Sequence, residues 1–264
     1  MSAVVAGVDI GSTTAKCVIL GEDSRVLGKS LNPVGVDIVK DAERALEAAL
    51  ADAHVPRTEV GFVTGTGYGR YKVYFGQLVV TEISCHARGA QFLFPGTRLV
   101  IDIGGQDTKA IRINDKGEVV DFAMNDKCAA GTGRFLDVCA NALGFDVGQI
   151  GPLSLQARHA VKVTSTCTVF AESEVTSYLS RGKDPKDILA GLHASIANRT
   201  LSLMQRVGVE PEITFTGGVS QNEGMVQALH RRIGAPVNVS PLSQYLGALG
   251  AALHGRERLK GGAS

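Results

Sequence analysis

The chain has 264 residues, of which 44% are hydrophobic and 20% charged, which is ordinary for a globular protein and enough for one large domain or two smaller ones. Its formal net charge of +1 gives no reason to expect nucleic acid or an anionic membrane as a partner. No apolar run approaches the roughly 20 residues that span a bilayer, and the N-terminus lacks the basic segment of a secretory signal. We therefore expect a cytoplasmic protein.

The first part of the chain alternates strands and helices. Residues 4–10 are predicted to form a buried strand, residues 11–14 a tight hairpin turn, and residues 16–20 the returning strand. The next expected elements, in order, are strand 25–31, helix 36–53, strand 60–64, a flexible glycine loop at 65–70 and helix 81–94.

The strand–turn–strand pattern then occurs a second time. Residues 99–103 and 108–113 are predicted strands around a turn at 104–107, and residues 119–123 form a third strand. Asp9-Ile10-Gly11 and Asp102-Ile103-Gly104 therefore begin the same kind of turn, and such a repeat sets the architecture. A hairpin tip with successive N–H groups can hold an anion, and an aspartate before it can hold a metal ion through water. One such turn alone could be an ordinary hairpin.

The second half of the chain is mostly helical. Helices are predicted at residues 133–143, 147–156, 168–180 and 185–207. A strand at 212–216 leads into a glycine turn at 217–222 and another helix, and a short strand follows at 237–239. A closing helix begins at residue 246 with small residues, which permit close packing against a neighbour.

The five cysteines include no C-x-x-C pair, so neither a disulfide framework nor a zinc ribbon is indicated. Cys17 and Cys139 lie in apolar periodic stretches and are predicted core residues. Cys85 neighbours a histidine, but their spacing does not support a metal site. Cys128 and Cys167 each precede a predicted helix, whose free N–H groups and dipole favour a thiolate or an anionic cluster. Two thiols cannot complete a four-coordinate site, so they are either structural thiols or half of a site shared with a second chain.

The two Asp-Ile-Gly turns, followed by Thr216-Gly217-Gly218-Val219, resemble the pattern of actin, sugar kinases and Hsp70 proteins over nearly the whole chain. The resemblance implies an α/β ATPase fold with two related subdomains, each a mixed sheet flanked by helices, and a nucleotide cleft between them. We expect the first subdomain to comprise residues 1–96 and the C-terminal helix 246–264. The second, with the cluster cysteines, would comprise residues 97–245.

The same resemblance implies residues that bind ATP, ADP and Mg²⁺. Asp9 and Asp102 would hold the metal ion, and Gln106 would orient the attacking water; the alternative for Gln106 is a polar turn residue. Lys16 would contact phosphate or else be a solvated strand lysine. Turnover would rest on positioning and electrostatics. The residues expected to bind the nucleotide are Gly11, Ser12, Thr13, Thr14, Lys16, Gly104, Gly105, Gln106, Asp107, Gly131, Thr132, Gly133, Glu172, Gly217, Gly218, Val219, Asn222, Gln244 and Gly247.

Residues 125–135 and 165–175 resemble, more narrowly, the activators of 2-hydroxyacyl-CoA dehydratases in the BadF/BadG/BcrA/BcrD ATPase family. Residues 65–70, 85–89, 102–107, 217–222 and 240–248 match the same family. This resemblance implies that Cys128 and Cys167 of two identical chains hold one [4Fe–4S] cluster at a homodimer interface. The shared arrangement supplies the four ligands that one chain lacks.

The resemblance further implies an ATPase that passes one electron at low potential to a 2-hydroxyacyl-CoA dehydratase, with ferredoxin or flavodoxin as its electron donor. The alternative is an ATPase subunit of a benzoyl-CoA reductase-type enzyme, and the intact turn at residues 104–107 favours the activator. A sugar or acetate-like kinase would need a catalytic base and a polar substrate pocket, which no segment evidently provides. A non-catalytic ATP-gated scaffold would leave the placement of the cysteines unexplained.

Overall fold

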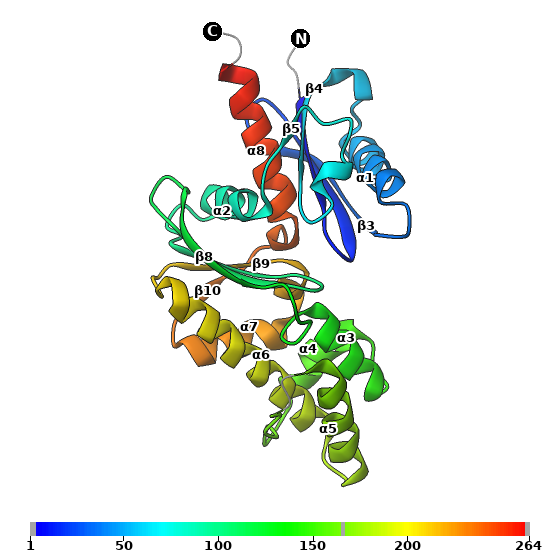
Figure 1. Cartoon of the computed structure of the whole chain (residues 1–264), viewed down its shortest axis with the longest axis vertical. Coiled ribbons are helices and arrows are strands. Elements are labelled where there is room, and N and C mark those ends of the chain that lie inside the picture. The colour runs from blue at the N-terminus through cyan, green and yellow to red at the C-terminus, as the bar shows by residue number, and fades with distance from the viewer. Residues whose placement is uncertain (1–3, 165–166, 262–264) are drawn as a thin grey trace. The chain divides into compact units, whose positions relative to one another are not determined.

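The computed structural model describes residues 4–164 and 167–261 (Figure 1). The chain divides into two compact units. The first unit consists of Met1–Gly96, Ile113–Val119 and Gln244–Ser264, and the second of Thr97–Arg112 and Val120–Ser243. Two five-stranded mixed sheets form the centres of these units.

The sheet of the first unit has the strand order β3-β2-β1-β4-β5. Its central strand β1 runs antiparallel to β2 and parallel to β4. In sheet order, its strands are β3 (Val26–Pro33), β2 (Thr14–Leu20), β1 (Val4–Ile10), β4 (Val60–Thr66) and β5 (Leu78–Val79).

One helix covers each face of this sheet (Figure 1). Helix α1 (Ile38–Ala53) packs its alanines and leucines on the face that carries the alternate apolar residues of β1. It begins after Asp37, whose side chain accepts a hydrogen bond from the Lys40 N–H, and ends at His54 with a left-handed φ of 54°. The predicted start at residue 36 is therefore two residues early.

The other face of the sheet is covered by α8 (Leu246–Gly261), which also crosses α2 (Glu82–Leu93). Gly7 of β1 permits this approach, because a Cβ there would lie 2.0 Å from the Ala248 carbonyl oxygen. At the helix crossing, a Cβ on Gly250 would lie 1.8 Å from the Cys85 carbonyl oxygen. The small residues predicted to permit close packing of the closing helix therefore do so.

The sheet of the second unit repeats the same topology with the order β10-β9-β6-β7-β8. Strand β6 runs antiparallel to β7 and parallel to β9, as β1 does to β2 and β4. In sheet order, the strands are β10 (Val237–Asn238), β9 (Ile213–Thr216), β6 (Leu99–Ile103), β7 (Thr108–Ile113) and β8 (Val119–Asn125).

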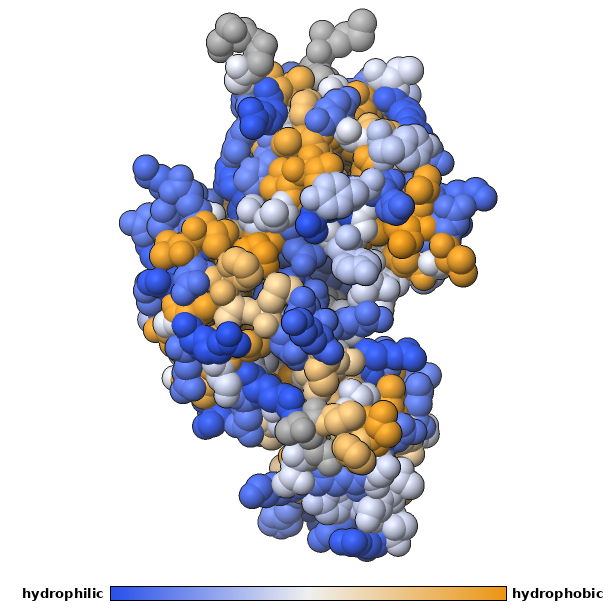
Figure 2. Space-filling view, viewed as in Figure 1, coloured by the Kyte–Doolittle hydropathy of each residue, from blue (hydrophilic) through white to orange (hydrophobic). Residues whose placement is uncertain are grey.

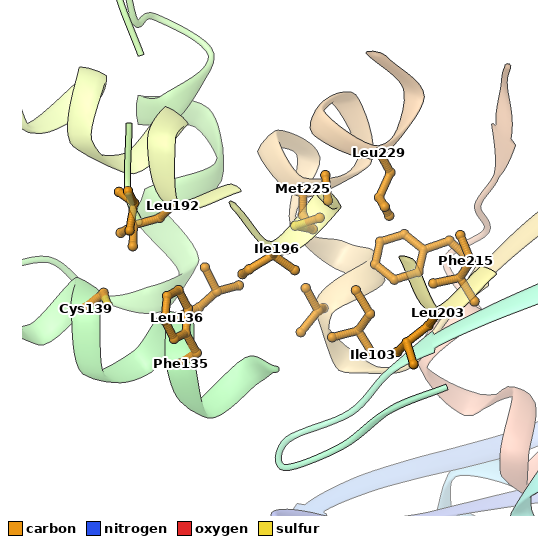
Figure 3. Packing of buried hydrophobic residues seen from close by; sticks show 14 of the residues in the cluster. Ile103, Phe135, Leu136, Cys139, Leu192, Ile196, Leu203, Phe215, Met225 and Leu229 are labelled. Carbon is orange, nitrogen blue, oxygen red and sulfur yellow. The ribbon is translucent and has the colours of Figure 1, made fainter. Parts of the chain in front are cut away.

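The helices described in the second unit are α3 (Gly133–Ala142), α4 (Val147–Ser154), α5 (Thr168–Ser180), α6 (Pro185–Val207) and α7 (Glu223–Ile233). The core lies between them and the sheet (Figure 3). Figure 3 shows side chains from α3, α6, α7 and the strands meeting there, with Cys139 beside Leu136 on α3. Helix α6 ends at Val207 and is followed by Gly208, whose φ of 89° is not helical.

Four short 3₁₀ helices lie between these elements: η1 (Arg57–Glu59), η2 (Arg70–Lys72), η3 (Gly218–Gln221) and η4 (Ser243–Tyr245). Within residues 4–164 and 167–261, no helix has the length and apolar character needed to cross a membrane.

Candidate functional site

The first turn, residues 11–14, has an ion pair at its base. Asp9 on β1 and Lys16 on β2 are register partners, and Lys16 Nζ lies 3.3 Å from Asp9 Oδ2. Their side chains are only 12% (Lys16) and 6% (Asp9) exposed, so both charges are largely withdrawn from water. The Gly11 N–H donates to the Thr14 carbonyl oxygen at 3.0 Å and closes the turn, which presents its hydroxyl residues at the tip.

The glycine loop at residues 65–70 is hydrogen-bonded to the end of β1. Gly67 has a φ of 90°, and a Cβ on it would lie 2.4 Å from Asp9 Oδ1 and 2.5 Å from the Ile10 carbonyl oxygen. The Gly69 N–H donates to the same carbonyl oxygen at 2.8 Å. Only glycine permits this approach and this backbone conformation, so the loop is positioned by Asp9 and Ile10.

The second turn, residues 104–107, repeats the first with one charge added. Lys109 Nζ lies 3.0 Å from Asp102 Oδ2, its register partner, and 2.7 Å from Asp107 Oδ2. The Lys109 side chain is 3% exposed. One ammonium between two carboxylates leaves this group with a net negative charge, whereas the pair in the first turn is neutral. The Gly104 N–H donates to the Asp107 carbonyl oxygen at 2.9 Å, and Gln106 is exposed at the tip.

The glycine turn after β9 meets the second turn as Gly67 meets the first. Gly217 has a φ of 87°, and a Cβ on it would lie 2.3 Å from the Ile103 carbonyl oxygen and 2.6 Å from Asp102 Oδ1. Asn222, expected to bind the nucleotide, uses its side-chain oxygen to accept from the Met225 N–H at 2.9 Å. It therefore caps α7.

Helix α3 is attached directly to the second turn. The Gly133 N–H donates to the Gly104 carbonyl oxygen at 2.9 Å, and the Arg134 N–H donates to that of Gly105 at 2.8 Å. A Cβ on Gly133 would lie 3.4 Å from Val219 Cγ2. These two N–H groups belong to the four that begin a helix without an intrahelical acceptor. The free helix start predicted for α3 is therefore wrong, because the turn carbonyls occupy it.

The cysteine loop, residues 126–132, is also hydrogen-bonded at both ends. The Thr108 hydroxyl, directly after the second turn, donates to the Gly131 carbonyl oxygen at 2.9 Å. Asn125 Nδ2, before the loop, donates to the carbonyl oxygens of Cys128 and Ala130 at 2.9 and 3.2 Å. The loop is thus connected to the second turn by its own backbone.

Cys128 is exposed and lies within this loop rather than at the helix start. The N-cap of α3 is Thr132, whose hydroxyl donates to the Ala129 carbonyl oxygen at 2.6 Å. The argument from the helix dipole therefore does not apply to Cys128 as the sequence suggested, because that effect falls off within the first turn.

Cys167 is itself the N-cap of α5, and its side chain makes no capping hydrogen bond. The dipole argument therefore applies to this thiol. Val169 and Phe170 follow on the first turn and are 66% and 68% exposed. Figure 2 shows apolar side chains at the surface in the lower part of the view, where Figure 1 places α3 and α5. Glu172, expected to sense the nucleotide, is exposed on the same helix.

The other three cysteines are buried, as predicted for Cys17 and Cys139. Burial raises the pKa of the Cys17 thiol far above its usual range. Burial raises the pKa of Cys85 to about 12, and burial with the nearby Glu172 carboxylate raises that of Cys139 to about 12. Across the described residues, no three His, Cys, Asp or Glu side chains gather as a metal site.

Gly247, in the first turn of α8, lies against Asp9. A Cβ on Gly247 would lie 2.8 Å from Asp9 Oδ2 and 3.0 Å from His86 Nε2. The absent side chain therefore leaves room for both polar groups. Gln244, its neighbour in η4, is partly buried.

Sequence reasoning missed three residues of these arrangements: Lys109, Thr108 and Gly67. Lys109 had a signal, because it follows Asp102 by the same seven residues that separate Lys16 from Asp9. Gly67 follows Thr66 as Gly217 follows Thr216. Thr108 had no signal, since the residue at its place in the first turn is Ala15.

Comparison with known proteins places these features in a family. The model of the BadF/BadG/BcrA/BcrD ATPase family matches residues 6–255. The (R)-2-hydroxyglutaryl-CoA dehydratase activating ATPase of Acidaminococcus fermentans is 47% identical over 255 residues, covering 96% of this chain and 97% of that protein. The crystal structure of component A of that organism's dehydratase has a TM-score of 0.95 at 45% identity, covering 98% and 100% of the two chains. An activator of 2-hydroxyisocaproyl-CoA dehydratase from Clostridium difficile, solved with bound ADPNP, has a TM-score of 0.94 at 42% identity, covering 98% and 97%.

Two more distant proteins bear on the fold and on the alternative family function. A ROK family glucokinase from Streptomyces griseus has a TM-score of 0.62 at 17% identity, covering 97% of this chain and 100% of that one. This likeness confirms the predicted actin/sugar kinase/Hsp70-like fold with two mixed sheets flanked by helices. A component of the benzoyl-CoA reductase of Thauera aromatica is 35% identical over 265 residues, covering 97% of this chain and 94% of that protein.

Proposed function

This chain belongs to the BadF/BadG/BcrA/BcrD ATPase family, and on that basis we propose that it is an ATP-hydrolysing iron–sulfur activator that reduces a 2-hydroxyacyl-CoA dehydratase at low potential. The observation that carries the proposal is the attachment of α3 and the cysteine loop to the second turn. Relatives at 47% and 43% identity are named for activating such dehydratases, which supports the choice of partner.

We assign the two units to the two ATPase subdomains and the two turns to the phosphates of ATP or ADP. Mg²⁺ prefers carboxylate oxygens and water. Asp9 and Asp102 both fit this role, and the net negative charge added by Asp107 makes the second turn the stronger cation site. Gln106, exposed at the tip, would orient the attacking water.

The nucleotide would be held largely by backbone. Residues 11–14 and Lys16, residues 104–107, residues 131–133, Gly217–Val219 and Gly247 offer N–H groups and close approach rather than reactive side chains. Such a site accelerates phosphoryl transfer by positioning the phosphates and stabilising developing charge. The structure adds Lys109, which holds the Asp102 and Asp107 carboxylates in place.

One chain supplies half of the cysteine ligands that a [4Fe–4S] cluster needs. Cys128 and Cys167 are the free thiols that reach the surface, and the other three are buried with raised pKa values. Two ligands per chain require a second copy to complete four. The exposed Val169 and Phe170 beside Cys167 supply apolar surface for that homodimer. The cluster, when bound, would supply the one-electron chemistry.

Coupling between nucleotide and cysteine would run through backbone contacts. If the second turn changes position when ATP replaces ADP, its carbonyl oxygens carry the start of α3 with them, and Thr108 carries Gly131. For ATP to shift the loop, the nucleotide must bind the two arrangements with different affinity. The position and the solvent exposure of Cys128 would then depend on which nucleotide is bound.

The proposed partners follow the family. The homodimer would take electrons from a ferredoxin or flavodoxin and pass them to the dehydratase in the cytoplasm. The second candidate is an ATPase subunit of a benzoyl-CoA reductase-type enzyme, which the 35% identity to the Thauera aromatica reductase component favours. The higher identity to dehydratase activators favours the first.

The proposal is tested with Cys128→Ser and a Cys139→Ala control, both purified without oxygen. We expect the wild type and the control to contain iron and to show the visible absorbance of the cluster, and the Cys128→Ser variant to lose both while it still binds ADP. Iron retained in Cys128→Ser would contradict the ligand assignment. A wild type that binds ADP but activates no 2-hydroxyacyl-CoA dehydratase would contradict the function.

A further inference from the structure

Arg199 on α6 lies against the cysteine loop. A Cβ built on Gly131 would lie 3.3 Å from Arg199 Cδ and 3.9 Å from Arg199 Cβ. The stem of the arginine therefore runs across the one residue of the loop that has no side chain and a φ of 86°. A side chain at Gly131 would displace Arg199 as well as strain the backbone.

Among the residues that the structure describes, no anionic side chain pairs with the guanidinium of Arg199. It is partly buried, and no carboxylate within residues 4–164 and 167–261 forms an ion pair or hydrogen bond with it. Arg112 of the same unit, by contrast, is paired with Glu210 at 3.2 Å. A partly buried cation that has given up part of its hydration gains most from a ligand that supplies the missing negative charge.

The position of Gly131 indicates which kind of anionic ligand would pair with Arg199. Its carbonyl oxygen accepts from Thr108, the residue directly after the second turn, and the next helix is bonded to Gly104 and Gly105. The arginine stem therefore lies against a loop that is hydrogen-bonded to the residue after the second turn, the turn assigned above to the phosphates. Arginine binds phosphate oxygens through two parallel N–H donors.

We propose that Arg199 binds the polyphosphate of the nucleotide, and that its stem on Gly131 conveys phosphate occupancy to the cysteine loop. The inference rests on the proposed function for the identity of the nucleotide. It adds to that function a residue that would distinguish ATP from ADP, because ATP carries more negative charge and a guanidinium binds the more charged polyphosphate more tightly. Replacing Arg199 should therefore weaken binding of ATP more than binding of ADP.

The test measures ADP and ATP affinity by calorimetry on the cluster-free chain with Mg²⁺. Arg199→Gln is expected to weaken ATP binding by at least about tenfold, the loss of roughly one charge-assisted hydrogen bond. Arg199→Lys keeps the charge and should recover part of the affinity at low salt. Arg206→Gln, an exposed arginine on the same helix, is the matched control and should bind as the wild type does.

Three outcomes separate the claims. A wild type that binds neither nucleotide contradicts the proposed function itself. A wild type and an Arg199→Gln variant with ATP affinities within about twofold contradict the role of Arg199 alone. If Arg199→Gln unfolds, the Arg199→Lys variant decides, since equal ATP affinity at low and high salt would also overturn the inference.

Discussion

The two units contain the same turn, yet within the described residues only the second turn is hydrogen-bonded to the loop of an exposed cysteine, Cys128. In each, an aspartate and a lysine face one another across two antiparallel strands, and a left-handed glycine touches the aspartate from the parallel strand. Gly67 and Gly217 have φ angles of 90° and 87°. The two units therefore contain the same arrangement of aspartate, lysine and left-handed glycine.

What surrounds each copy differs. The first turn is bonded to its own sheet, where the Val34 N–H donates to the Thr13 carbonyl oxygen at 2.9 Å. The second turn is bonded to α3 and, through Thr108, to the cysteine loop. The 3₁₀ helix after Gly67 buries no residue, whereas the one after Gly217 buries two. Under the proposed function, the first copy would hold a phosphate, and the second would hold a phosphate and transmit its presence to the cysteine loop.

The largest expected difference concerns the two lysines. Lys109→Met would remove the buried ammonium that lies between the Asp102 and Asp107 carboxylates, and we expect a loss of about 3–5 kcal/mol in the free energy of unfolding. Lys16→Met leaves only Asp9 unpaired in a slightly more open pair, so a loss of about 1–3 kcal/mol is expected. Denaturant unfolding measures both, with the exposed Lys116→Met as the control. Equal losses would show that the added carboxylate does not matter.

The second prediction concerns acid and applies to the second unit. Burial lowers the pKa of His193 from 6.5 to about 4, and neither ring nitrogen has a hydrogen-bond partner within the described chain. Below about pH 6.5, His193 is protonated in the unfolded chain but stays neutral in the folded chain. The free energy of unfolding therefore decreases as pH falls from about 6.5 to about 4. The full loss is about 3 kcal/mol.

Hydrogen exchange resolved by peptide measures this loss. Peptides of α6 should lose protection on acidification in the wild type and less so in His193→Gln at the same pH, while peptides of α1 respond alike in both. A pH response of α6 that is unchanged by His193→Gln would assign the effect to other groups.

Much of this comparison could be predicted from the sequence, because it depends on local patterns. The repeated Asp-Ile-Gly turns and the bounds of α5 and α6 follow from periodicity and from glycine, aspartate and proline at the element ends. The tertiary contacts could not be predicted in this way. Occupation of the α3 start by turn carbonyls, and the fixed position of Gly67, depend on segments far apart in the chain. The stretch 165–166, ahead of Cys167, lies outside the described residues.

The smallest substitution makes the second turn resemble the first. Thr108→Ala places in β7 the residue that β2 has at this position, Ala15, and removes the hydrogen bond to Gly131. The stability cost is expected to be about 1 kcal/mol. Affinity for ADP should be retained, since the turn itself is unchanged.

The most direct measurement is the rate at which iodoacetamide alkylates Cys128 in the cluster-free chain with bound ADP or a non-hydrolysable ATP analogue. Cys17 and Cys139, which are buried, serve as internal controls and should stay unlabelled. Nucleotide-dependent movement of the cysteine loop predicts two different rates in the wild type and a smaller difference in Thr108→Ala. Identical rates with the two nucleotides in the wild type would contradict coupling between the second turn and Cys128.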